Sequence, residues 1–289
     1  MLIRQPDVPE SSDREFTHGV EQLAELMRGR VTVVLSGAGL STDSGIPDYR
    51  GPERAGAVRT PITYQQFVSD AAMRRRYWAR STVGWLVMDA RRPNAGHRAV
   101  ARLERAGVVN GVITQNVDGL HQAAGSGNVV ELHGSLAYAV CLRCGRRERR
   151  DSLQLRLESL NRHITPAEVV ALPDGDADLP DELVEGFNVP ACLHCGGTLK
   201  ADVVFFGENV PRQRVERAFE LLHAADAVLV LGSSLAVRSG YRFVVAAREA
   251  GKRVAIVNHG PTRGDDDAHV RVEGRLGEVL PELVQRLLV

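Results

Sequence analysis

The sequence lacks long apolar runs, and it has almost no lysine. No apolar stretch approaches the roughly 20 residues that span a bilayer. The N-terminal MLIRQPDVPESSDREF also lacks the apolar core of a secretory signal. Lys200 and Lys252 are the only lysines, a skew that suggests a GC-rich bacterial genome and says nothing about chemistry. We expect a cytoplasmic protein without a membrane partner.

The sequence also lacks net charge. Its 36 basic and 36 acidic residues cancel, and the isoelectric point is about 7.1. Short basic clusters at 74–76 and 146–150 are balanced by acidic residues elsewhere and are typical of solvated helix faces. This balance argues against a broad electrostatic surface for nucleic acid, and we expect no direct nucleic-acid binding.

Cysteine is scarce, but its spacing is informative. CLRC and CLHC have the same spacing and supply Cys141, Cys144, Cys192 and Cys195. Without a secretion signal a disulfide framework is not expected, whereas two C-x2-C pairs suit one structural zinc in tetrahedral coordination. Gly145 and Gly196 follow the pairs and allow the backbone to turn around the metal. The alternatives are four unrelated buried cysteines, or His194 in place of one thiolate.

Short apolar, β-branched runs alternate with helical patterns along much of the chain. These runs occupy residues 31–35, 108–115, 129–132, 226–232 and 253–258. The alternation is clearest from 200–206 onward. It predicts an α/β fold, a Rossmann-like doubly wound parallel sheet with helices on both faces.

Two regions break this rhythm and predict a smaller domain. Residues 51–105 are helical in pattern, and residues 138–199 contain both cysteine pairs. We predict a helical insertion and a zinc-binding module that together form one wall of a cleft at the carboxyl ends of the strands. The predicted nucleotide-binding domain comprises 20–50, 106–137 and 200–289, and residues 1–19 are an N-terminal extension.

A glycine-rich segment follows the first predicted strand. GAG at 37–39 lets backbone N–H groups approach a pyrophosphate, and TQNVDGLH (114–121), GSSL (232–235) and VNHG (257–260) follow other strands. Together these segments predict a nucleotide-binding rim along one edge of the sheet. The fingerprint of dehydrogenases is incomplete, because Thr42 stands at its third glycine and no acidic residue ends a second strand. This pattern argues against hydride transfer.

His133 follows another predicted strand, in ELHG. An imidazole is the natural general base near neutral pH, and a sugar hydroxyl would be a suitable partner for it. We expect Gln115, Asn116 and Asp118 close to it if adjacent strand ends converge. The alternative is a histidine with a structural role.

In this order, the motifs resemble those of sirtuins, the NAD-dependent protein-lysine deacylases. The resemblance covers residues of about 20–285 and rests also on GIPDYRG (45–51), PNAGHRAV (93–100) and VVFFGE (203–208). RRYWARSTVGW, SGYRF and GPTRGDD are similar to the class II branch. That branch includes a mitochondrial sirtuin with lipoamidase, deacylase and ADP-ribosyltransferase activities.

The resemblance implies that the chain consumes NAD as a co-substrate and contains one structural Zn²⁺. It implies transfer of the acyl group from lysine to ADP-ribose, which yields nicotinamide, O-acyl-ADP-ribose and free lysine. The implied catalytic residues are His133 as general base, with Asn116 and Asp118 at the nicotinamide pocket. The implied NAD contacts are Gly37, Ala38, Gly39, Thr42, Asp48, Tyr49, Arg50, Gln115, Asn116, Asp118, Gly232, Ser233, Ser234, Asn258, His259, Gly260 and Leu276.

The implied partners are acyl-lysine proteins or peptides. Such a peptide would pair as a strand between FFGE and the segment after GSSL. The implied contacts in the first of these are Val204, Phe205, Phe206 and Gly207. Two residues depart from the family pattern: Tyr49 stands where many members have Phe, and Leu276 where Cys is common, so a backbone contact is expected at Leu276.

Tyr77 and Arg80 are the candidate residues for selecting the acyl group of the substrate. They are three residues apart, on one face of a predicted helix. Acid-preferring sirtuins use such a pair to bind a succinyl or glutaryl carboxylate, which arginine can bind through two parallel hydrogen bonds. The alternative is a helix with a core tyrosine and a solvated arginine.

Three other functions compete with deacylation. A protein mono-ADP-ribosyltransferase would use the same pocket and leave label from NAD on protein. A non-enzymatic zinc module would bind nucleic acid with steep salt dependence. A dehydrogenase would produce NADH.

Overall fold

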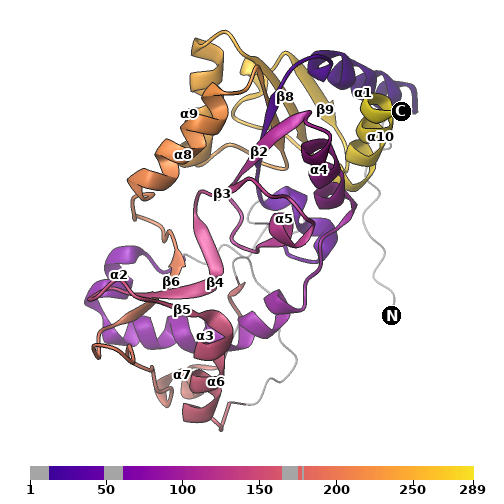
Figure 1. The fold of residues 1–289 in the computed structure, drawn as a ribbon. Helices are drawn as coiled ribbons and strands as arrows, with labels where there is room; N and C mark the ends of the chain where they lie inside the picture. Colours follow the sequence, from indigo (N-terminus) through magenta and orange to yellow (C-terminus); the bar gives the residue numbers. More distant parts are fainter. Residues whose placement is uncertain (1–12, 49–60, 165–174, 178) are drawn as a thin grey trace, which may run out of the picture.

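The computed structural model describes residues 13–48, 61–164, 175–177 and 179–289, and the side chains of residues 13–16 are left undescribed. Its centre is a six-stranded sheet in the order β3-β2-β1-β7-β8-β9, in which every neighbouring pair is parallel (Figure 1). The strands are β1 (Thr32–Ser36), β2 (Val109–Thr114), β3 (Val129–Glu131), β7 (Ala227–Leu231), β8 (Arg253–Asn258) and β9 (Val270–Glu273). The predicted parallel sheet is confirmed, and each of the five predicted runs corresponds to one of its strands, namely β1, β2, β3, β7 and β8.

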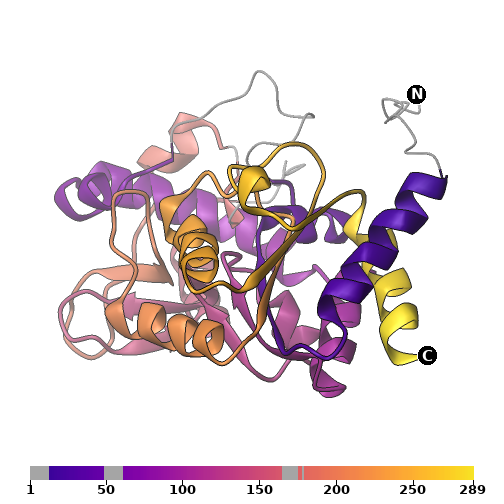
Figure 2. The same ribbon diagram turned by 90° about the horizontal axis from the view of Figure 1, so that it is seen from above.

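Helices cover both faces of this sheet. α1 (Asp13–Met27), α4 (Ala95–Arg105) and α10 (Leu276–Leu288) bury one face around Val34 and Val112. α8 (Arg212–His223) and α9 (Arg238–Glu249) bury the other around Val33 and Ile113. Figure 2 shows the two groups on opposite sides of the sheet. Adjacent strand residues thus point into different cores, as in a doubly wound fold.

A second layer of elements forms a small lobe, at the bottom of Figure 1. Its antiparallel sheet has the order β5-β4-β6. Its elements are α2 (Tyr64–Ser69), α3 (Ala71–Asp89), β4 (Gly134–Cys141), β5 (Arg147–Arg149), α6 (Arg150–Leu160), α7 (Asp181–Glu185) and β6 (Leu199–Val203). One core joins both sequence insertions, because Phe67 and Trp78 pack in the same cluster as Leu153 and Leu199.

Two elements lie elsewhere than the sequence suggested. Residues 200–206, which the sequence analysis placed in the nucleotide-binding domain, overlap β6, and β6 pairs with β4 in the small sheet rather than continuing the large one. α4 falls in the range 51–105 expected for the insertion, yet Val100 and Leu103 pack in the core of the large sheet. We therefore propose that the helical insertion of the small lobe ends before α4, and that the zinc-binding part of this lobe extends through β6.

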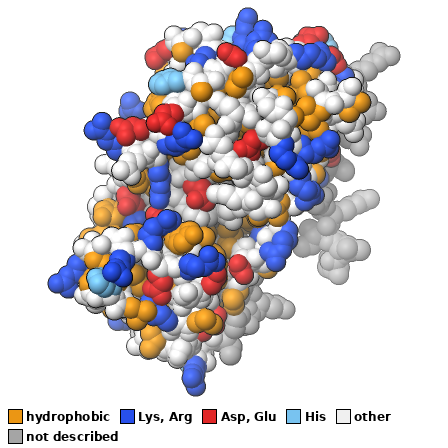
Figure 3. Space-filling model, in the orientation of Figure 1, with side chains coloured by type: hydrophobic (Ala, Val, Ile, Leu, Met, Phe, Trp, Pro, Cys, Tyr) orange, Lys and Arg blue, Asp and Glu red, His pale blue; other side chains and the backbone are white. Residues whose placement is uncertain are grey.

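No helix in the described part of the chain is both long and apolar enough to cross a bilayer. Figure 3 shows basic and acidic side chains interspersed over one face of the molecule. This mixture on one face matches the zero net charge of the sequence.

Candidate functional site

The glycine loop after β1 is fastened to the end of β7. Gly37 N–H donates to the Leu231 carbonyl and Gly39 N–H to the Gly232 carbonyl, each at 2.9 Å. A Cβ on Gly37 would lie 2.8 Å from the Gly232 carbonyl oxygen, and one on Gly39 would lie 3.0 Å from it. These glycines are therefore required by the approach of two backbones. The sequence had suggested only room for a ligand.

The same loop retains donors for an anion. Among the described residues, the N–H groups of Ala38 and Ser234 have no acceptor, and both residues are half-buried. Thr42 is exposed beside them, with its hydroxyl donating to the Gly39 carbonyl at 3.0 Å. Free N–H groups and small side chains after parallel strands suit a pyrophosphate, so the donor set fits NAD.

Asn116 and Asp118 meet the loop through Ser41, which the sequence had not singled out. Asn116 Nδ2 donates to the Gly37 carbonyl and to Ser41 Oγ, each at 3.0 Å. Ser41 Oγ donates in turn to Asp118 Oδ2 at 2.7 Å. Burial raises the pKa of Asp118, while hydrogen bonds from Leu120 N–H and Ser41 lower it. The network fixes two predicted nicotinamide-pocket residues against the phosphate loop.

His133 lies between the two lobes, after β3 and directly before β4. Its Nδ1–H donates to the Gln115 carbonyl at 3.0 Å, so Nε2 is the acceptor nitrogen of the neutral ring. Ser239 Oγ lies 2.8 Å from Nε2 and donates to it. Burial lowers the pKa of His133, opposed by the Gln115 hydrogen bond and reinforced by the charges of Arg242 and Arg214. The imidazole is therefore neutral and ready to accept a proton at pH 7.

The predicted adenosine side is held by β9. Asn258 Nδ2 donates to the Gly260 carbonyl at 2.8 Å, and Gly260 N–H donates to Glu273 Oε1 at 2.9 Å. Exposed His259 lies 3.6 Å from the same carboxylate. Leu276 is buried in the large core, and the backbone contact expected there stays a prediction. Gln115 Nε2 donates to Ser233 Oγ at 2.8 Å and joins the GSSL turn to the end of β2.

The predicted substrate segment follows β6 beside His133. Val204 N–H donates to the His133 carbonyl at 2.7 Å. Phe205 is buried, whereas Phe206 and Gly207 are exposed. Glu208 accepts from Phe205 N–H at 2.9 Å and pairs with buried Lys200 at 3.0 Å. This ion pair holds the segment against β6.

Tyr77 and Arg80 lie on α3 near this segment, and both are engaged. The Tyr77 ring packs 5.0 Å from that of Phe205, and burial raises the pKa of Tyr77. Arg80 donates to Asp176 Oδ2 at 2.5 Å and to the Ala177 carbonyl at 2.7 Å. Two nitrogens of this guanidinium, Nε and Nη2, are therefore already engaged within the chain.

Only one of the three residues predicted on the cofactor loop, Asp48, Tyr49 and Arg50, lies within the described part of the chain. Asp48 is half-buried and is the last described residue before the range 49–60. Tyr49 and Arg50 lie outside the described residues.

The four cysteines converge as predicted. Their sulfur atoms all lie within 4.8 Å of one another; Cys141 Sγ is 3.5 Å from Cys195 Sγ, and Cys144 Sγ is 3.9 Å from Cys192 Sγ. Tetrahedral zinc with bonds of about 2.3 Å needs sulfur separations of about 3.8 Å. The site therefore fits one Zn²⁺ with four thiolates, and His194 is outside the cluster.

Both knuckles have the same backbone turn. Gly145 N–H donates to the Cys141 carbonyl and Gly196 N–H to the Cys192 carbonyl, each at 2.9 Å. The two glycines have φ of 71° and 70°, in the left-handed region that glycine adopts readily. This confirms the turning role predicted for them.

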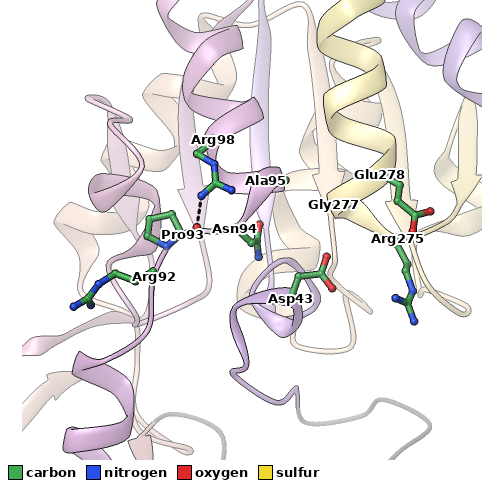
Figure 4. Close-up of a pocket in the computed structure, with 9 residues that line it drawn as sticks. All are labelled: Asp43, Arg92, Pro93, Asn94, Ala95, Arg98, Arg275, Gly277 and Glu278. Carbon is green, nitrogen blue, oxygen red and sulfur yellow. Dashed lines mark hydrogen bonds between the residues drawn. The ribbon is translucent and has the colours of Figure 1, made fainter. Parts of the chain in front are cut away.

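A separate cavity of about 540 Å³ lies where Asp43 faces the starts of α4 and α10 (Figure 4). It is lined by Asp43, Arg92, Pro93, Asn94, Ala95, Arg98, Arg275, Gly277 and Glu278. None of these was a predicted site residue. Asn94 Nδ2 donates to the Leu40 carbonyl at 2.7 Å and so supports the phosphate loop from this side.

Comparisons with known proteins agree on one family. The model of the Sir2 family matches residues 37–239. The chain is 55% identical over 271 residues to "NAD-dependent protein deacetylase 1" of Streptomyces coelicolor, covering 94% of this chain and 91% of the relative. It is 54% identical to "NAD-dependent protein deacetylase" of Xanthomonas campestris, covering 87% and 86%.

Solved structures give the same answer. A Sir2 structure with a p53 peptide and NAD⁺ has a TM-score of 0.73 at 31% identity, covering 92% of this chain and 97% of that chain. A Sir2 structure with a propionylated peptide has a TM-score of 0.73 at 30% identity, with the same coverage.

Proposed function

The chain belongs to the Sir2 family, and on this premise we propose that it is an NAD-dependent protein deacetylase with His133 as its general base. The relatives at 54–55% identity that carry this activity in their names support the reaction class. The observation that carries the assignment of His133 is its hydrogen bonding, because Nδ1–H is bound to a carbonyl and Nε2 is left as acceptor.

Different residues of the chain would bind NAD, orient the base and accept the proton. NAD, when bound, supplies the ribose carbon that receives the acyl oxygen and the hydroxyl that is deprotonated. His133 Nε2 would take the proton from that hydroxyl, while the Gln115 carbonyl keeps the ring in the required tautomer. Asn116, fixed by the Gly37 carbonyl and Ser41, would line the nicotinamide pocket. Zn²⁺ would hold the two cysteine knuckles together and take no part in turnover.

The substrate would be an acyl-lysine peptide lying along the segment after β6. Phe206 and Gly207 are exposed there, and the bond from Val204 N–H to the His133 carbonyl keeps this segment close to the base. A peptide strand would gain main-chain hydrogen bonds with little sequence demand. Because Arg80 is occupied by Asp176, we propose that uncharged acyl groups are preferred over acidic ones.

The test is a panel of acyl-lysine peptides incubated with NAD, with nicotinamide release as the readout. Wild type should release nicotinamide with acetyl-lysine. His133→Ala should lose at least about 100-fold in turnover, the usual contribution of a general base, while zinc content and melting temperature stay unchanged. His18→Ala, at an exposed position on α1, is the matched control and should behave as wild type. Full activity of His133→Ala would remove His133 from the role of base.

A further inference from the structure

Ser239, at the start of α9, is hydrogen-bonded to His133. Its Oγ lies 2.8 Å from His133 Nε2, and His133 Nδ1–H is bound to the Gln115 carbonyl. A hydroxyl on the acceptor nitrogen of an imidazole, whose other nitrogen is oriented by a third group, is the arrangement of an activated nucleophile. Among the described residues, no other hydroxyl is hydrogen-bonded to His133.

The position of Ser239 is built into the start of α9. Ser239 is the second residue of this 12-residue helix. A Cβ on the next residue, Gly240, would lie 2.6 Å from Gln115 Oε1. The helix start therefore lies against the side chain of Gln115, whose backbone carbonyl binds His133. The helix N-terminus also favours negative charge that develops on a nearby oxygen.

The surroundings keep the base able to act on this hydroxyl. His133 is half-buried, and burial together with the charges of Arg242 and Arg214 holds its pKa below the usual value. A neutral Nε2 is the nitrogen that can accept a proton from Ser239, as it is for a substrate hydroxyl. The same base therefore has two candidate hydroxyl partners, one from substrate and one from the chain itself.

We propose that Ser239 is an internal acceptor for the ADP-ribosyl group, so that the chain modifies itself when NAD is present and acyl-lysine is absent. The proposal rests on the NAD-dependent function proposed above. His133 Nε2 takes the proton of Ser239, and Oγ forms a bond to C1′ of the nicotinamide ribose. The glycosidic bond breaks and its electron pair leaves with nicotinamide, which is neutral when released. The proton passes from His133 to solvent.

This reaction has a consequence for activity. An ADP-ribosyl group on Ser239 would occupy the space in front of His133 Nε2, where the substrate hydroxyl must come. Preincubation with NAD alone should therefore lower later deacetylation in proportion to the fraction of modified chains. An acetyl-lysine peptide present from the start should protect, because its acyl oxygen competes for C1′.

The experiment uses the zinc-loaded full chain with NAD labelled in its adenosine half, without peptide. We expect up to one ADP-ribosyl group per chain, located at Ser239 by fragmentation mass spectrometry. Ser239→Ala should lose the label at least tenfold, and Ser239→Thr should retain part of it. Ser152→Ala removes an exposed hydroxyl on α6 and should be labelled as wild type. Zinc content and melting temperature establish that each variant is folded.

A readout without NAD tests the hydrogen bond itself. In ¹⁵N spectra of the imidazole, Ser239→Ala should shift the His133 Nε2 resonance and leave Nδ1 protonated. An unshifted Nε2 resonance would overturn the proposal.

The labelling outcomes separate this proposal from the proposed function. Label that persists in Ser239→Ala, or no label in a preparation that releases nicotinamide with acetyl-lysine peptide, overturns the acceptor role alone. No nicotinamide release under any condition overturns the proposed function, and the acceptor role falls with it.

Discussion

Single residues set the charge states of the core, and the clearest case is a pair of buried histidines. His97 on α4 and His121 on α5 (Leu120–Ala123) are at most 1% exposed, with ring centroids 5.1 Å apart. His121 Nε2 is hydrogen-bonded to Ser36 Oγ at 2.9 Å. His97 Nε2 and His121 Nδ1 have no partner among the described residues. Burial lowers their pKa values to about 4 and about 3.

These two histidines predict acid sensitivity of the fold. Their folded-state pKa values lie below the unfolded value of about 6.5, so the unfolded chain binds more protons and stability falls as pH decreases. The loss should begin near pH 6.5 and continue to about pH 3, with on the order of 3 kcal/mol from His97 alone. Urea unfolding of wild type and His121→Gln across this range checks it. An identical pH dependence in the two proteins would contradict the prediction.

Asp176 sets a second prediction at the residue scale. Its carboxylate holds Arg80 at 2.5 Å where an acidic acyl group would have to bind. Asp176→Ala should raise kcat/KM for glutaryl-lysine relative to acetyl-lysine by roughly tenfold, because a charge-assisted hydrogen bond to the freed Arg80 contributes about 1.5 kcal/mol. Adding Arg80→Met to the Asp176→Ala variant should remove that gain and leave kcat/KM for acetyl-lysine unchanged. Equal changes on both peptides would show that the pair has no part in acyl selection.

At the scale of elements, the phosphate loop depends on its contact with the end of β7. Gly232 has φ of 60°, and a Cβ there would lie 2.4 Å from Leu40 N. Gly232→Ala should therefore lower the free energy of unfolding by more than about 2 kcal/mol and weaken NAD binding.

Gly107→Ala is the control for this change. Gly107 has φ of 75° with no atom within 4 Å of an added Cβ, so only backbone strain of about 1 kcal/mol is expected. Calorimetry of unfolding and titration with NAD measure both effects. Equal losses in the two variants would mean that the contact between the backbones is unimportant.

The accuracy of the sequence predictions also differs by element. β1, β2, β7 and β8 were predicted because buried parallel strands are continuous apolar runs. β9 was missed because VRVE alternates polar and apolar residues on the outermost strand. β6 has the composition of a parallel strand, and its antiparallel partner β4 depends on tertiary contacts that no local pattern encodes.

In the candidate site, too, features encoded by local patterns were predicted and contacts between distant residues were not. The proximity of Gln115 to His133 was predicted because the carboxyl ends of parallel strands meet at one edge. The roles of both residues toward NAD came from the resemblance to sirtuins and stay predictions. Ser41 and Ser239 were not given roles, because an isolated serine has no spacing signature. The contact between Ser239 and His133 joins residues 106 positions apart in the chain. The pairing of Arg80 with Asp176 was hidden for the same reason, since its partners are 96 positions apart.

At the scale of the whole molecule, the zinc site belongs to the core of the small lobe, which is separate from the two cores that flank the large sheet. Cys141 and Cys192 pack in the same cluster as Trp78 and Leu153, so the metal site and the small core are continuous. A strong chelator should unfold the small lobe, because thiolate–zinc binding energy is also folding energy. Scanning calorimetry should then show loss of the small-lobe transition, restored by added Zn²⁺. A melting profile unchanged by complete zinc removal would contradict a structural role.

The connection between the two sheets has a mechanical consequence. β3 ends at Glu131 and β4 begins at Gly134, so His133 is one of only two residues between the parallel sheet and the antiparallel sheet. Its carbonyl is bound to Val204 of the small lobe, and its ring is bound to Gln115 and Ser239 of the large one. A rotation of one lobe against the other should therefore change the orientation of the imidazole ring. If a peptide binds beside Val204 as proposed, its binding should also change the orientation of the imidazole.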